Sequence, residues 1–171
     1  MAAIPLDLDS VQNAMSGYGE PLDSFKWCIE SLPSFFGLTI PKEYVLETSI
    51  PMPTFGSKQK QTAATVITLP DVGEISGFDL VLHEDQKGST FKYIISWMEH
   101  IQNPHSGGFY LPYNYKRDLI VQLQNKKGEV AIRAKLKGCY PHSPSPISLS
   151  GGGGEVVKIS CGMAVDAMIP L

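Results

Sequence analysis

The sequence contains no apolar run that approaches the roughly 20 residues needed to span a bilayer. Its first ten residues, MAAIPLDLDS, lack the basic stretch followed by an apolar one that marks a secretory signal, so we expect the chain to stay in the compartment where it is made. The net charge of −3 gives no electrostatic case for gripping nucleic acid, which needs clustered Lys and Arg. We therefore expect no membrane partner and no sequence-specific nucleic-acid partner.

Motifs for catalysis and metal binding are absent as well. No two histidines have the spacing of ligands on one helix face, and HExxH, GxSxG and a phosphate-binding loop are all missing. The cysteines are odd in number and form no CxxC pair, so they predict neither a zinc site nor a disulfide framework. We interpret them as small buried hydrophobes: Cys28, Cys139 and Cys161. We expect no catalytic residue, no metal, no cofactor and no enzymatic activity.

What the sequence does contain is enough apolar material for one domain. With 43% hydrophobic and 18% charged residues, a chain of 171 residues can bury a core. Breakers at Gly17, Gly19 and Pro21 favour an irregular N-terminal arm over residues 1–23. Residues 24–171 are then expected to form the domain.

The centre of the predicted domain is a strand followed by a helix, between residues 78 and 102. In FDLVLHE, Phe78, Leu80 and Leu82 alternate with polar or smaller residues, as in a half-buried strand. Ser89 or Thr90 is placed to cap the next helix. The helix carries an apolar stripe at helical spacing, which predicts the surface by which it docks on the strands: Phe91, Ile94, Ile95, Trp97 and Met98.

Further strands are predicted over residues 24–30, 43–50, 117–124, 129–138 and 155–170. Loops or turns are expected at residues 70–77, 103–115, 139–149 and 151–154, where Pro, Gly or polar residues gather. Six or seven strands and one helix predict a mainly β fold, an antiparallel β barrel or sandwich with the helix on its flank.

Residues 54–69 form an unusual polar segment. They are rich in Thr and Gln and have few large apolar side chains before Val66. As a strand the segment would be polar on both faces, so a lone domain gains little by ordering it. Two interpretations stay open: a mobile surface hairpin, or strands that pair with neighbouring subunits.

The order of these segments resembles the tail tube proteins of contractile-tailed bacteriophages. SFKWCIE, EYVLETSIPMP, a long polar strand pair and FDLVLHE-DQKGS-TFKYIISWMEHIQ with its central Trp97 follow one another as in that family. Lys137, Gly138, Tyr140 and Pro141 are similar to its KG-aromatic-Pro turn, although Cys139 is inserted before the Tyr. The resemblance covers about residues 24–170, and its strength lies in the ordered set more than in any single motif.

The resemblance implies a structural virion protein of the phage tail, assembled in the host cytoplasm. Six copies would form a ring, and stacked rings would form the inner tube that conducts DNA. Implied partners are further copies, the tail sheath protein, the baseplate initiator, the tail terminator, and the tape measure protein and DNA held non-specifically in the lumen. A long hairpin would serve ring formation, with subunit-interface or lumen candidates at Val45, Glu47, Ser57, Lys58, Lys60, Thr62, Thr65, Val66 and Thr68.

Three alternatives remain. The first is a tube-initiator or baseplate protein of the same fold, whose C-terminus often continues into further structure. The given sequence ends at Leu171, directly after the last predicted strand, and this favours the repeating tube subunit as our expectation. The second is the tube protein of a type VI or extracellular injection system. The third is a small β-barrel binding module or enzyme, which needs a concave pocket with convergent polar groups that the sequence does not indicate.

Overall fold

Antiparallel strands dominate the described part of the chain. The computed structural model describes residues 22, 26–63, 65–147 and 156–171. Every pairing between the strands is antiparallel, which confirms the mainly β prediction with one principal helix. The elements in chain order are β1 (Trp27–Ile29), the 3-10 turn η1 (Lys42–Tyr44), β2 (Val45–Thr48), β3 (Pro53–Gln61), β4 (Val66–Ile75), β5 (Phe78–His83), α2 (Ser89–Glu99), α3 (Pro112–Tyr115), β6 (Arg117–Gln124), β7 (Val130–Pro144), β8 (Lys158–Ala164) and β9 (Ala167–Pro170).

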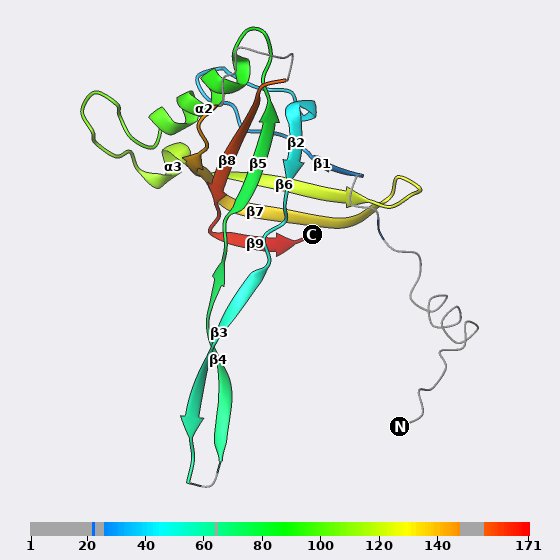
Figure 1. Cartoon of the computed structure of the whole chain (residues 1–171), viewed down its shortest axis with the longest axis vertical. Helices are drawn as coiled ribbons and strands as arrows, with labels where there is room; N and C mark the ends of the chain where they lie inside the picture. Colours follow the sequence, from blue (N-terminus) through cyan, green and yellow to red (C-terminus); the bar gives the residue numbers. More distant parts are fainter. Residues whose placement is uncertain (1–21, 23–25, 64, 148–155) are drawn as a thin grey trace.

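The long strand β7 joins two layers that cross one another (Figure 1). Its first part pairs with β6 and β9, and its last part pairs with β8, so the strands follow the order β1-β6-β7-β8-β5-β2. The change of direction falls at Gly138, whose φ of 67° suits glycine and where a Cβ would clash with the Asp166 carboxylate. Among the described strands β1 and β2 remain unjoined outer edges, so the fold is an open sandwich and not a closed barrel.

The core lies between these layers and beneath α2. Trp97 is its central side chain: it is fully buried, its ring stacks on Phe35 with centroids 4.7 Å apart, and its Nε1 donates to the Tyr115 carbonyl at 2.8 Å. The predicted alternation of β5 is confirmed, because Phe78, Leu80 and Leu82 are all buried. Full burial of an apolar side chain of this size contributes about 1.5–3 kcal/mol.

The docking face of α2 differs in part from the predicted stripe. Ile94 and Trp97 are buried and Met98 packs against the core, but Phe91 and Ile95 are 47% and 38% exposed, so their assignment to the docking face was wrong. Tyr93 is buried in their place, and its hydroxyl donates to the Pro33 carbonyl at 2.8 Å. The segment that follows β1 lies against the helix and covers Tyr93, a contact that helical periodicity alone cannot show.

The start of α2 is capped by acidic residues that precede it, and the predicted Ser89 or Thr90 cap was wrong. Gly88 occupies the cap position with φ of 70° and offers no side chain. The Glu84 carboxylate accepts the backbone N–H groups of Thr90 at 2.9 Å and Phe91 at 2.7 Å. Asp85 Oδ1 accepts the backbone N–H of Ser89 at 2.9 Å. Two carboxylates therefore satisfy the free N–H groups of the first turn and interact favourably with the helix dipole.

Several predicted loops turn out to be strand. β4 runs through most of residues 70–77, and β7 continues through Cys139–Pro144, where a register shift between Pro141 and Ser143 accommodates a proline without an N–H. The predicted last strand is divided into β8 and β9, and residues 43–50 begin with η1. The predicted arm, apart from Leu22, and residues 151–154 lie outside the described residues.

Candidate subunit interface

β3 and β4 form a two-stranded ribbon that projects away from the core (Figure 1). They follow β2 and precede β5, which pair with one another, so the ribbon prolongs one edge of the sheet. Every described residue from Pro53 to Glu74 is exposed. A two-stranded ribbon alone is marginally stable in water. This hairpin is therefore the strongest candidate for contact with another molecule.

The register of the hairpin sorts its side chains onto two faces. Paired residues share a face, and neighbours along a strand alternate. Ser57, Gln59, Gln61, Thr68 and Val66 lie on one face, because Gln59 pairs with Thr68 and Gln61 with Val66. The opposite face carries Lys58 paired with Leu69 and Lys60 paired with Ile67. The predicted lumen candidates therefore lie on opposite faces and cannot all line one wall.

The same register determines which backbone groups of the hairpin point outward. Thr62 N–H donates to the Thr65 carbonyl at 2.8 Å, which makes this a hydrogen-bonded pair. Bonded and non-bonded pairs alternate in an antiparallel ladder. The pairs Gln61–Val66 and Gln59–Thr68 are then non-bonded, and their backbone N–H and C=O groups point away from the hairpin. Pro70 agrees with this assignment, since a proline fits only where no ladder N–H is needed.

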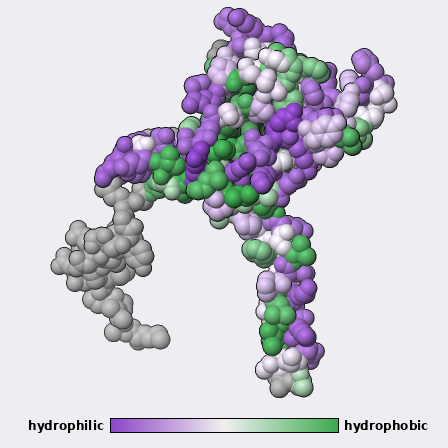
Figure 2. Space-filling model, turned by 180° about the vertical axis from the view of Figure 1, so that it is seen from behind, coloured by the Kyte–Doolittle hydropathy of each residue, from purple (hydrophilic) through white to green (hydrophobic). Residues whose placement is uncertain are grey.

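Two of the predicted candidates form the tip of the hairpin. Thr62 Oγ1 lies 2.7 Å from the Thr65 carbonyl and 3.1 Å from the Thr65 hydroxyl. These bonds order the end of the ladder. Figure 2 shows hydrophobic side chains interspersed with hydrophilic ones along the ribbon, and its exposed apolar residues are Phe55, Val66, Ile67, Leu69 and Val72.

Val45 is not available as an interface or lumen residue. It is only 9% exposed, belongs to the core cluster and pairs with Leu82. Its assignment to the interface was wrong because β2, unlike β3, lies over the core. Glu47 in the same strand is exposed, opposite Val81, and stays a candidate.

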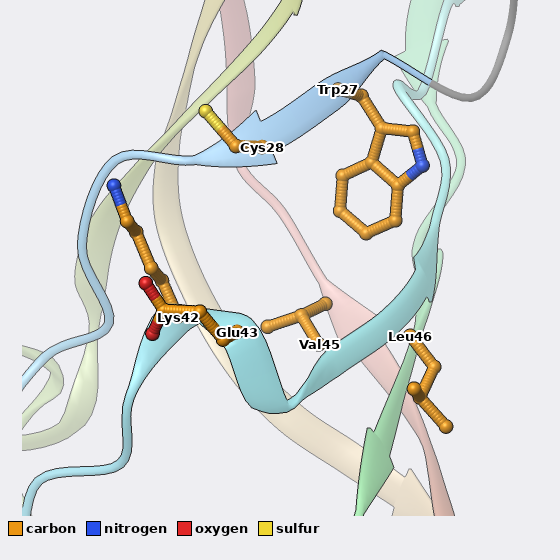
Figure 3. Close-up of a pocket in the computed structure, with 6 residues that line it drawn as sticks. All are labelled: Trp27, Cys28, Lys42, Glu43, Val45 and Leu46. Carbon is orange, nitrogen blue, oxygen red and sulfur yellow. The ribbon is translucent and has the colours of Figure 1, made fainter.

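A cavity of about 340 Å³ lies between β1 and the η1–β2 segment (Figure 3). It is lined by Trp27, Cys28, Lys42, Glu43, Val45 and Leu46. These two segments contain β1 and β2, the two ends of the strand order, so the cavity marks a seam where the sandwich stays open. Cys28 Sγ accepts a hydrogen bond from Gln122 Nε2 at 3.0 Å. No histidine and no carboxylate pair lines it, so it lacks the convergent groups of an active site.

Two of the three cysteines are buried in the core. Burial raises the pKa of Cys139 and of Cys161 to about 12, so both thiols are protonated and pack as small hydrophobes. Within the described ranges no group of three or more His, Cys, Asp or Glu side chains is placed to hold a metal ion. In the same part of the chain no helix is long and apolar enough to cross a membrane.

Solved structures share this architecture. The chain of an anti-feeding prophage cap, a tube-terminating cap, superposes with a TM-score of 0.67 at 14% identity, covering 90% of this chain and 92% of that one. A chain of the sheath-tube complex of the PVC extracellular contractile injection system gives 0.63 at 15% identity, with 88% and 91% covered. This chain has the tail-tube fold. No family model matches the sequence, and no curated protein does.

The tail-tube fold also extends to a chain of the anti-feeding prophage baseplate, with a TM-score of 0.61 at 13% identity over 90% of this chain and 97% of that one. The similarity therefore covers structures described as a cap, a sheath-tube complex and a baseplate. Identity this low shows the fold alone.

The loop predicted after α2 presents an aromatic side chain to solvent, which the sequence did not indicate. The Asn103 side chain accepts the backbone N–H groups of His105 and Ser106, and the Gln102 amide donates to the Gly107 carbonyl. The loop presents Phe109, 77% exposed, to solvent. Its aromatic residues were visible in the sequence, but nothing in their spacing indicates that they point outward.

Proposed function

We propose that this protein is the repeating structural subunit of the inner tube of a contractile injection machine, such as a phage tail. The observation that carries the proposal is the β3–β4 hairpin, which has both outer edges unpaired within the described chain and no covering layer. Unpaired strand edges promote pairing with other chains, and closure into a ring removes them. The tail-tube fold supports the same assignment.

In the proposed assembly, copies form rings of six, and the rings stack. The contact between copies is heterologous: one surface of a subunit meets a different surface of the next, and repetition around an axis closes the ring. Outward-pointing N–H and C=O groups at Val66 and Thr68 would form ladder bonds with the neighbouring copy. Sheath, baseplate initiator and terminator proteins would contact the outside and ends of the tube, with the tape measure protein and DNA inside.

We propose that the hairpin face with Ser57, Gln59, Gln61 and Thr68 lines the lumen. These side chains are polar and uncharged. Cationic contacts would hold DNA through counterion release, so a neutral wall favours transit. The opposite face, where Ile67 and Leu69 stand between lysines, has apolar area to bury against protein.

A terminator cap of the same tube is the second candidate, because the cap structure is as similar to this chain as the sheath-tube chain is. Stacking separates the two functions, since a tube subunit adds to its own rings and a cap forms a single ring. Sedimentation velocity over a range of concentrations, with negative-stain microscopy of the same samples, tests this. We expect rings that lengthen into tubes. Single rings at every concentration would support the cap, and a monomer throughout, even with the baseplate initiator added, would contradict both.

A hairpin-deleted variant is the matched control for that experiment. Replacing residues 54–74 by a short glycine turn removes no described residue that is buried, so the core and the helix are expected to stay folded. The variant is expected to remain a monomer with an unchanged helical signal in circular dichroism. Ring formation by this variant would show that the hairpin is not the subunit contact.

A further inference from the structure

The sheet formed by β1, β6 and β7 extends beyond the layer that covers it. Ile29, Val121 and Ala134 lie level with one another on its inner face, and each is at most 2% exposed. Two residues further along each strand, the next row on the same face is only partly covered, although its side chains are large and apolar: Trp27, Leu123 and Ile132. Ile132 is 45% exposed. This row, which we call the apolar ledge, therefore has apolar area left to bury.

The apolar ledge borders the cavity between β1 and the η1–β2 segment. In Figure 3 the ring of Trp27 and the side chain of Val45 point into the space between these two segments. Leu46 adds a further apolar side chain to the lining and is 39% exposed. The ledge and the cavity together form one partly open apolar site along the seam of the sandwich.

The outer edge of β1 offers backbone groups at the same place. Gln124 N–H donates to the Lys26 carbonyl at 2.7 Å. Glu30 N–H donates to the Ile120 carbonyl at 3.0 Å. Bonded and non-bonded pairs alternate, so Trp27 belongs to a non-bonded pair. Its N–H and C=O therefore point away from β6, where an extended segment could pair with them.

Lysine side chains lie at both ends of this seam. Lys42 lines the cavity and is exposed. At the end next to Trp27, the turn between β6 and β7 gathers three lysines: Lys26, Lys126 and Lys127. Lys26 Nζ donates to the Lys126 carbonyl at 2.8 Å. The acidic residues beside them are fewer, namely Glu43 in the lining and Glu129 in the turn. The seam thus favours an occupant that carries both apolar and acidic side chains.

A segment with this chemistry stands near the start of the same chain. We propose that residues 4–9, Ile-Pro-Leu-Asp-Leu-Asp, cover the apolar ledge of their own subunit. In an extended segment, neighbours alternate between two faces, so Ile4, Leu6 and Leu8 share one face. Asp7 and Asp9 lie on the other. The apolar face would pack on the ledge, and the two carboxylates would lie beside the lysines.

The composition and length of the N-terminal part of the chain support this assignment. Residues 1–23 contain four acidic residues and no Lys or Arg. Residues 10–25 connect the segment to β1 and can span up to about 55 Å, so the segment can reach its own subunit. A contact within one chain acts at an effective concentration in the mM range, which favours the same chain over another copy.

The proposed contact would cover one free edge of the sandwich. Unpaired strand edges promote pairing with other chains. With β1 covered, the β3–β4 hairpin would keep its exposed edges while the seam would not compete with it. The inference concerns the single subunit and does not depend on ring formation.

Trp27 reports on the contact, because the other tryptophan, Trp97, is fully buried. The experiment measures acrylamide quenching of tryptophan fluorescence in the full-length wild type and in Leu6→Ser with Leu8→Ser, at concentrations below assembly. Each leucine lost from an apolar site lowers the covering equilibrium by about tenfold or more, so the double variant is expected to lose at least about a hundredfold. Its Trp27 is then quenched more strongly and emits at longer wavelength than in the wild type. Trp27→Phe in each background identifies the signal.

The matched control is Val11→Ser with Met15→Ser, which makes the same kind of change outside residues 4–9 and is expected to quench as the wild type does. A second variant, Asp7→Lys with Asp9→Lys, tests the charges. It is expected to expose Trp27 at low salt, and to differ little from the wild type in ~1 M salt, where charges are screened beyond about 3 Å. A difference that persisted in high salt would contradict the contact between these carboxylates and the lysines.

Three results would overturn the inference. Equal quenching in the wild type and in the Leu6 and Leu8 variant would show that residues 4–9 do not cover Trp27. An equal increase in the Val11 and Met15 control would remove the assignment to that segment. Protection of Trp27 that grows with protein concentration would assign the occupant to another copy. None of these results bears on whether the wild type forms tubes, so the proposed function is tested separately.

Discussion

Replacing Val66 by proline tests the hairpin contact without disturbing the subunit. Val66 is 57% exposed, and its N–H points outward from a non-bonded pair with Gln61, so the substitution removes no hydrogen bond of the monomer. In the ring it removes one bond per contact, about 1 kcal/mol. Six contacts give roughly 6 kcal/mol per ring, or about a 10⁴-fold loss in ring formation.

The assay compares the ring–monomer equilibrium of Val66→Pro with that of Val66→Thr, which keeps the N–H and the β-branched shape. Sedimentation velocity measures assembly, and urea unfolding measures monomer stability. We expect Val66→Pro to stay monomeric with a free energy of unfolding within ~1 kcal/mol of the wild type, and Val66→Thr to assemble. Normal tubes from Val66→Pro would refute the assignment of the β4 edge to the contact.

Three further predictions concern the subunit itself. Trp97→Ala, at a fully buried position, is expected to lower the free energy of unfolding in urea by ~3–5 kcal/mol. Phe91→Ala, at a position 47% exposed, is expected to lower it by less than ~1 kcal/mol. Equal losses of stability in the two variants would contradict the described helix face. The backbone N–H of Ser89 lowers the pKa of Asp85, so Asp85 stabilises the fold above its unfolded-state pKa, and this stability is lost as the pH falls through the folded-state pKa. Asp85→Asn is therefore expected to reduce the loss of unfolding free energy at acid pH. An unchanged dependence of stability on pH would refute the role of Asp85 as a cap. Burial raises the pKa of Cys139 and Cys161 to about 12, so iodoacetamide followed by mass spectrometry should label both only after unfolding; rapid labelling of the native protein would show that they are accessible.

Elements with a clear period could be predicted from the sequence. β5 and β6 lie where alternation placed them, because one face of each strand is buried and the other is not. The buried Trp97 and Ile94 also follow from the helical stripe. Tyr93 could not be predicted, since its burial depends on the Pro33 carbonyl and on a segment distant in sequence.

The candidate interface could be predicted in location but not in geometry. Contact with other chains was one of two interpretations of the polar segment over residues 54–69, and the exposed hairpin lies there. The sequence could not show which residues of β4 share a face with Ser57 and which share one with Lys58, because register is set by pairing across the turn. Val45 was misplaced because only the three-dimensional path shows where the ribbon leaves the core.

Electron cryomicroscopy of the assembled protein would show directly where the hairpins lie. We expect stacked rings around an open channel, with the β3–β4 hairpin of each copy beside that of its neighbour and Ser57, Gln59 and Thr68 on the channel wall. Rings in which the hairpins point away from the axis, or in which neighbouring hairpins do not touch, would contradict this expectation.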